Sequence, residues 1–300
     1  MLLKALPVFR DPDVAALSWA IASAPLVKEN CGELPIIDEE WCDQQLELHL
    51  DWLKQLDSDP SSLKNFIQDD DTKLLGKRFE SLLAFWFQQS PHFELIGRSI
   101  RFESSGASGE ADFLIRDLTD GELIHLEAAC KYYIGMPYSP KRNTWVGPNG
   151  IDSLQLKVEK LRKQVNLFRT APGKKFLEEH GLEIPGRAVL LKGYFFHPLQ
   201  SLSMPVAPAD AHRHYSAGWY IHRTELAFFE HDPEQWLVLP KSRWMCPFHF
   251  HDRDVSVLNG REMIEQVHRE MNLHQKAVLI IQVERSDNML HELSRGFVIR

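Results

Sequence analysis

Two apolar, β-prone runs joined by a turn constrain the fold of this chain more than any other feature. Residues 110–117 (EADFLIRD) and 123–135 (LIHLEAACKYYIG) flank the turn-forming segment DLTDGE. Short runs rich in branched and aromatic residues, bounded by Asp and Gly, are typical of an antiparallel hairpin. Each run has an acid among its apolar residues, Asp112 in the first and Glu127 in the second, and neighbouring strands can place two such side chains together on one face. The segment therefore predicts paired strands that bear paired carboxylates.

The patterns on either side extend this hairpin into a larger unit. Residues 73–90 have the apolar spacing of a helix, with Glu80 in the middle and with Asp71 or Thr72 as the expected N-cap. Residues 93–103 alternate as a further strand. A helix at 153–168, begun by Asp152 or Ser153, and a buried strand at 187–198 follow. The order of helix, three-strand meander, helix and strand predicts an α/β (α+β) fold.

The remaining sequence predicts additions at both ends of this core. Residues 1–70 are expected to form a helical N-terminal segment, with amphipathic helices at 14–27 and 44–56. The core itself is expected to occupy 71–200. Residues 201–300 are expected to form a C-terminal α/β extension that packs on the core, with several strand segments and a helix at 261–272.

Composition places the chain among globular proteins rather than disordered or membrane proteins. Hydrophobic residues make up 44% of the 300 residues, and the apolar stretch at 14–27 is too short to span a bilayer. The four cysteines have no CxxC spacing, which favours reduced thiols over disulfides or a zinc site. We therefore expect a cytoplasmic protein that does not act at a membrane.

The charge is distributed unevenly along the chain. The net charge is −8, yet residues 131–213 hold 13 basic and 6 acidic side chains. A local basic surface can attract phosphates even on an acidic protein, although surface lysines often serve only solubility. If nucleic acid is the partner, the candidate contacts in this block are Lys141, Arg142, Lys160 and Lys163.

Two motifs give the chain a resemblance to known families. The segment GEADFLI at 109–115 and the pair Glu127 and Lys131, within the order of elements above, resemble the core of the PD-(D/E)xK nuclease superfamily over roughly residues 70–200. More closely, HLEAACKYYIG together with WLVLPKSRW at 236–244 resembles the DUF1853 family of uncharacterised bacterial proteins, over most of the chain.

The nuclease resemblance implies a restriction-endonuclease-like core and a set of functional residues. Asp112 and Glu127 would be ligands of Mg²⁺ or Mn²⁺, and Lys131 would be the catalytic lysine. Glu80 would add a carboxylate from the preceding helix. Lys157, and with it Gln155, would face the site from the following helix.

The spacing of the lysine departs from the superfamily pattern. The usual spacing is E-x-K, whereas Lys131 is four residues after Glu127 and Ala129 stands at the usual lysine position. In an unbroken strand Lys131 would face the same side as Glu127 but about 13 Å away. A bulge near 128–130 could draw Lys131 back, Lys157 could take its place, or cleavage could have been lost.

Simpler structural roles are also open to these residues. Glu127 and Lys131 could be an i,i+4 pair on a helix, although the β-prone run at 132–134 favours a strand. Asp112 could pair with Arg101.

Other polar and aromatic groups predict a site less strongly. His212 and His214, and the segment 249–252 (HFHD), are interpreted as polar loops rather than metal sites, since neither pair has matching ligands nearby in the sequence. Trp236 and Trp244 could form an aromatic surface for nucleic acid or belong to the core.

The function expected from the sequence is a metal-dependent endo- or exonuclease. The alternatives are a catalytically inactive nucleic-acid-binding protein of the same fold and a scaffold protein whose acidic N-terminal part docks a basic partner.

Overall fold

The computed structural model describes residues 6–69, 74–104, 107–137, 139–251, 255–274, 276–286 and 288–300. The N-cap expected at Asp71 or Thr72 and the candidate Asp252 lie outside these residues. No helix within them is long and apolar enough to cross a membrane. Short 3-10 turns occupy Cys31–Glu33, Arg142–Thr144, Leu167–Arg169, Leu199–Ser201, Arg223–Phe229 and Lys241–Arg243.

Helices form the N-terminal part of the chain. They are α1 (Pro12–Ala22), α2 (Glu39–Ser58), α3 (Ser61–Asp69) and α4 (Leu75–Gln89). The helix expected at 44–56 is confirmed but begins earlier, because the Asp38 side chain accepts a hydrogen bond from the Trp41 N–H and caps α2. Asp11 caps α1 in the same way. The DSDPSS segment separates α2 from α3 as a break in the helical pattern, and α3 itself was not predicted from the sequence.

The central strands follow the expected order. The antiparallel meander consists of β1 (Phe93–Ser104), β2 (Ala107–Asp117) and β3 (Leu123–Gly135). The chain then adds a short strand, β4 (Trp145–Val146), beside β3, and crosses the sheet through α5 (Leu154–Gln164) and α6 (Ala171–His180). It returns as β5 (Gly186–Pro198), parallel to β3. Ser153, one of the two residues expected to cap this helix, is the N-cap of α5.

The C-terminal third continues the same sheet. Its elements are β6 (Ser216–His222), β7 (Gln235–Leu239), β8 (His249–His251), α7 (Gly260–His274), β9 (Val278–Ser286) and β10 (Met289–Ile299). The strand order is β1-β2-β3-β5-β6-β10-β9-β7, and both the β5–β6 and the β6–β10 pairs are parallel. The fold is therefore a mixed α/β fold, with one sheet that runs from the expected core into the expected extension.

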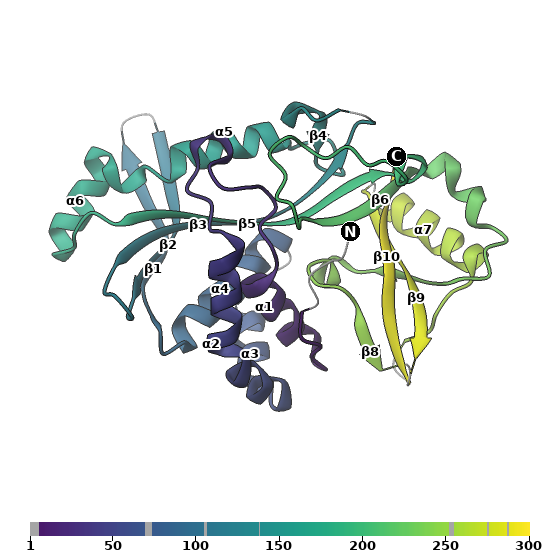
Figure 1. Ribbon diagram of the computed structural model, residues 1–300, viewed down its shortest axis with the longest axis horizontal. Coiled ribbons are helices and arrows are strands. Elements are labelled where there is room, and N and C mark those ends of the chain that lie inside the picture. The colour runs from purple at the N-terminus through teal and green to yellow at the C-terminus, as the bar shows by residue number, and fades with distance from the viewer. Residues whose placement is uncertain are drawn as a thin grey trace.

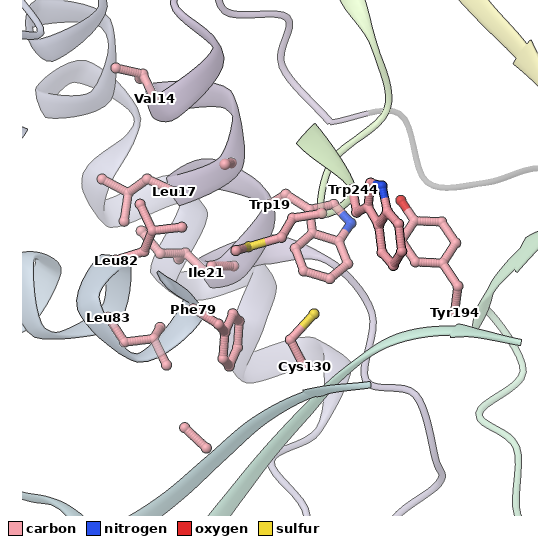
Figure 2. Close-up of a cluster of buried hydrophobic side chains, with 14 of the residues drawn as sticks. Val14, Leu17, Trp19, Ile21, Phe79, Leu82, Leu83, Cys130, Tyr194 and Trp244 are labelled. Carbon is pink, nitrogen blue, oxygen red and sulfur yellow. The ribbon is translucent and has the colours of Figure 1, made fainter. Parts of the chain in front are cut away.

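One face of the sheet carries the main core. Figure 1 shows α1–α4 on one side of β3 and β5 and α5 on the other. The even-numbered residues of β3 from Leu126 to Tyr132 pack with the N-terminal helices. In Figure 2, Cys130 of the sheet lies below helix residues such as Leu17 and Leu82, and the rings of Trp19 and Trp244 lie beside that of Tyr194. Trp244 and Trp236 are both buried, so the structure places both in the core.

The opposite face of β3 is covered by α5. Ala129 and Tyr133 pack there with Leu154, Val158 and Leu161 of the helix. Successive side chains of a strand alternate between faces, so Glu127 and Lys131 also project toward α5. The Glu127/Lys131 segment is therefore a strand rather than a helix.

Candidate active site

The two predicted carboxylates meet where strands β2 and β3 separate. Over the described residues, the ladder between these strands runs from Arg116↔Leu123 to Phe113↔Leu126. At the next position the Asp112 N–H points at Glu127 Oε1, 3.4 Å away, and the Ala128 N–H donates to Asp112 Oδ2 at 2.9 Å. Each carboxylate thus bonds a backbone N–H of the other strand where the regular ladder has ended.

Burial makes Asp112 and Glu127 weaker acids than usual. Burial, followed by the negative charge of Glu127, raises the pKa of Asp112 to about 6. Burial likewise raises the pKa of Glu127 to about 7, although the Asp112 N–H and the charge of Lys157 act in the opposite direction. Close to neutral pH, the pair therefore holds protons that a bound cation would displace.

His125 lies beside Glu127 on the same strand face. Both side chains are fully buried, and His125 Nε2 is 2.8 Å from Glu127 Oε1. Burial lowers the pKa of His125 to about 4, so the imidazole is neutral and we assign its donating proton to Nε2. The contact is therefore a hydrogen bond that orients Glu127. The sequence analysis missed this residue, although its position two residues before Glu127 is a signal that could have identified it.

Glu127 has one oxygen left over. Its Oε2 is buried and has no hydrogen-bond partner among the residues that the structure describes. An unpaired buried carboxylate oxygen is costly unless a proton or a cation occupies it. Glu127 Oε2 is therefore available to bind a proton or a cation, and the carboxylate of Asp112 is next to it.

Lys131 does not approach the carboxylates. Its ammonium pairs with the carboxylate of Asp152, at the start of α5. The pairing of β3 with β5 runs without a register shift from Ile124↔Gly186 to Ile134↔Phe196. No bulge at 128–130 therefore shortens the strand between Glu127 and Lys131, and that explanation for the unusual spacing is wrong.

Lys157 is the lysine whose charge acts on the carboxylate pair. It lies on α5, half-buried, and its positive charge lowers the pKa of both Asp112 and Glu127. Burial lowers the pKa of Lys157 itself, against the opposing effect of the two acids. No hydrogen bond or ion pair joins its ammonium to another described residue. By contrast, Gln155 bonds Glu159 on the helix surface.

The carboxylate expected from the preceding helix is also close. Glu80 of α4 is half-buried, and burial, with a contribution from Asp112, raises its pKa. Lys77 bonds Glu80 at 2.7 Å and lies 3.6 Å from Glu110. Glu80, Lys77 and Asp112 line a cavity of about 50 Å³, room for a single small ion or a water molecule.

The predicted nucleic-acid contacts differ in how exposed they are and in whether they are already paired within the fold. Lys141, Lys160 and Lys163 are exposed, and the last two lie on α5 with Lys157. Arg142 is instead half-buried and bonds Asp210 Oδ2 at 2.5 Å, so its guanidinium is already used within the fold. Arg101 bonds Glu110 rather than Asp112.

Comparison with known proteins identifies the chain at the level of a family. A family model described as "Domain of unknown function (DUF1853)" matches residues 15–299. No curated protein and no solved structure matches the chain.

Proposed function

The chain belongs to the DUF1853 family, and we propose that it is a Mg²⁺-dependent phosphodiesterase with a restriction-endonuclease-like core that acts on nucleic acid. The observation that carries the proposal is the meeting of Asp112 and Glu127 where β2 and β3 part, within reach of the charge of Lys157. Convergent carboxylates near a lysine are the groups that metal-dependent phosphodiester hydrolysis needs.

The donors at this point suit a hard divalent cation. Asp112 and Glu127 offer oxygen atoms from adjacent strands, and Glu127 Oε2 has no described partner. Mg²⁺ prefers carboxylate oxygen and retains several water molecules, so two protein carboxylates suffice for a site. When bound there, Mg²⁺ would supply a polarised phosphate oxygen and an acidified water. His125 holds Glu127 in place through its hydrogen bond, as the outer partners of metal ligands commonly do.

We assign the lysine role to Lys157 rather than Lys131. The ammonium of Lys131 is committed to Asp152, whereas the charge of Lys157 acts on both carboxylates and its ammonium has no ion-pair partner in the described part of the chain. A lysine in this position neutralises charge on a phosphate and helps to hold the attacking water. Exposed Lys160 and Lys163 continue the positive charge along α5 and would contact the nucleic-acid backbone.

A nucleic-acid-binding protein without cleavage activity is the second candidate. It is favoured by the pairing of Lys131 with Asp152, which removes the lysine of the superfamily motif from the site. Both candidate functions use the basic surface of α5. They differ only in whether Lys157 takes the catalytic role that the superfamily motif gives to the lysine at position 131.

Cleavage assays on single- and double-stranded DNA and RNA, with Mg²⁺ or Mn²⁺, test the proposal. We expect Asp112→Asn and Glu127→Gln to abolish cleavage and Lys157→Met to reduce it by about 100-fold or more. Lys131→Met is the matched control and should change the rate by less than about tenfold, because Lys131 does not face the carboxylates.

Three other outcomes would redirect the interpretation. Loss of activity in Lys131→Met but not in Lys157→Met would contradict the lysine assignment. Binding that weakens with salt and with Lys160→Gln, but without cleavage, would support the inactive binding protein. Absence of both binding and cleavage would favour the scaffold role.

A further inference from the structure

A second group of metal-binding side chains lies outside the carboxylate site. Glu39 is the first residue of α2, and His212 and His214 lie in the connection between β5 and β6. One potential ligand atom from each of the three lies within 4.8 Å of the other two. His214 Nδ1 is 2.7 Å from Glu39 Oε2, and His212 Nε2 is 3.9 Å from the same oxygen. Two imidazoles therefore converge on one carboxylate from a distant part of the sequence.

The connection that carries the histidines is fixed to the body of the protein. The His212 N–H donates to Leu26 O at 3.1 Å, and Ala211 forms a bridge with Val27. The His214 N–H donates to His212 Nδ1 at 3.2 Å, so in the neutral ring the proton lies on Nε2, the nitrogen that faces Glu39. To bind an ion through Nε2, His212 moves this proton to Nδ1 and gives up the hydrogen bond from the His214 N–H. The position of the connection is thus set by the fold before any ligand binds.

Burial and access suit a bound ion. The side chains of Glu39 and His212 are each 14% exposed, and that of His214 is 42% exposed, so the group is shielded but can be reached from solvent. Arg213 Nη2 is 4.0 Å from Glu39 Oε2, but its side chain is 78% exposed and can move into solvent when a cation binds. The present contact between His214 and Glu39 would open by less than about 1 Å to admit an ion bonded to both at about 2 Å.

An adjoining cavity provides room for a further ligand. His214 lies in the wall of a cavity of about 330 Å³. The hydroxyls of Ser18, Ser23 and Tyr194 also line this cavity; all three are buried and have no hydrogen-bond partner among the described residues. Buried hydroxyls usually find a partner, so this wall is suited to a polar ligand or to ordered water in the cavity that His214 lines.

We propose that Glu39, His212 and His214 form a three-residue site for a divalent transition-metal ion of the zinc class, with a coordination position open toward the cavity. Imidazole and carboxylate donors select such ions over Mg²⁺, which prefers oxygen alone. Three protein ligands with one open position are the arrangement of zinc sites that bind an additional molecule. This site is independent of the carboxylate pair on β2 and β3.

Titration calorimetry of the full-length protein with Zn²⁺, in the presence of excess Mg²⁺ to occupy the carboxylate site, tests the proposal. We expect one Zn²⁺ per chain and at least about tenfold weaker binding in His212→Ala, His214→Ala and Glu39→Gln, since even the outer partners of metal ligands are worth that much. Absorption of bound Co²⁺ should change in the same variants. His274→Ala is the matched control, because His274 and Glu270 form an exposed pair, 3.6 Å apart, with no third ligand among the described residues.

The proposal is overturned if the wild-type protein binds no Zn²⁺, or if the three variants bind it as the wild type does. Loss of Zn²⁺ binding in Asp112→Asn, with binding retained in His214→Ala, would place the ion at the carboxylate site and also overturn it. Glu39→Gln preserves the shape of the side chain, so it separates loss of a ligand from loss of folding, and circular dichroism of each variant checks the latter.

Discussion

At the scale of single residues, the properties of Asp112 and Glu127 depend on the groups that surround them. Asp112 and Glu127 were identifiable in the sequence because an acid inside an apolar strand is unusual. Their raised pKa values were not, because burial by α5 and the contact between the two acids depend on the assembled fold. The role of His125 depends on the fold in the same way. Its position two residues before Glu127 places both side chains on one face of the strand, but only burial makes the imidazole a neutral donor to Glu127.

The raised pKa of Glu127 predicts a specific pH dependence of stability. Because folding raises this pKa from 4.5 to about 7, the folded state favours the protonated form. The associated stabilisation is complete below pH 4.5 and is lost as the pH rises through 7. The free energy of unfolding of Glu127→Gln, relative to the wild type, should therefore increase by on the order of 2 kcal/mol across that range.

Urea unfolding at several pH values, without divalent cations, measures this difference. Glu183→Gln is a suitable control, since the hydrogen bond from Arg116 lowers the pKa of Glu183 and no increase with pH is expected. A wild type and a Glu127→Gln variant with parallel pH profiles would show that Glu127 titrates normally in the folded protein.

At the scale of elements, the straightness of β3 decides which lysine is available. The β3–β5 ladder is continuous, and Gly193 of β5 lies opposite Lys131 with φ of 139°. A Cβ at Gly193 would overlap the Lys131 carbonyl, so this close approach requires glycine. The sequence showed that Lys131 was too far from Glu127 for an unbroken strand, but it could not show whether the strand was broken, because that depends on the partner strand.

We therefore expect Gly193→Ala to be strongly destabilising. The added methyl group would force β5 away from β3 at Lys131, and a cost of about 3 kcal/mol or more is typical when a side chain meets backbone in a strained conformation. Gly76→Ala in α4 is the control, because a Cβ there meets nothing within 4 Å, and alanine should stabilise the helix by up to about 1 kcal/mol. Thermal unfolding followed by circular dichroism compares the two; equal melting temperatures would contradict the role given to Gly193.

At the scale of the whole molecule, the sheet and its core connect all three expected parts. Arg295 of β10 is buried, bonds both oxygens of Glu292, and donates to the carbonyls of Trp244 and Cys246. Its guanidinium also lies over the ring of Tyr194 on β5, 4.3 Å from the centroid. The same hydrophobic cluster contains residues of α1, α4, β3 and β10. The C-terminal third is thus packed into the core that supports the site.

This continuity predicts that the chain unfolds as one unit. Calorimetry of the full-length protein should give a single transition, and a fragment of residues 1–200 should lack cooperative unfolding, because it exposes the edge of β5 and the face that Phe297 and Trp244 cover. A fragment that unfolds cooperatively near the temperature of the full chain would instead support a separate core that ends near residue 200.

The sequence by itself determined the local elements and the candidate acids. Apolar periodicity, caps and turns act over a few residues, so the meander, the helix begun at Ser153 and the strand ending at Pro198 were predictable. Tertiary structure alone decided that Lys131 pairs with Asp152 and that the charge of Lys157 acts on Asp112 and Glu127. It also brought Glu39 to the two histidines that the sequence assigned to a polar loop. Contacts between segments so far apart in the chain depend on how the sheet and helices pack, which local patterns do not encode.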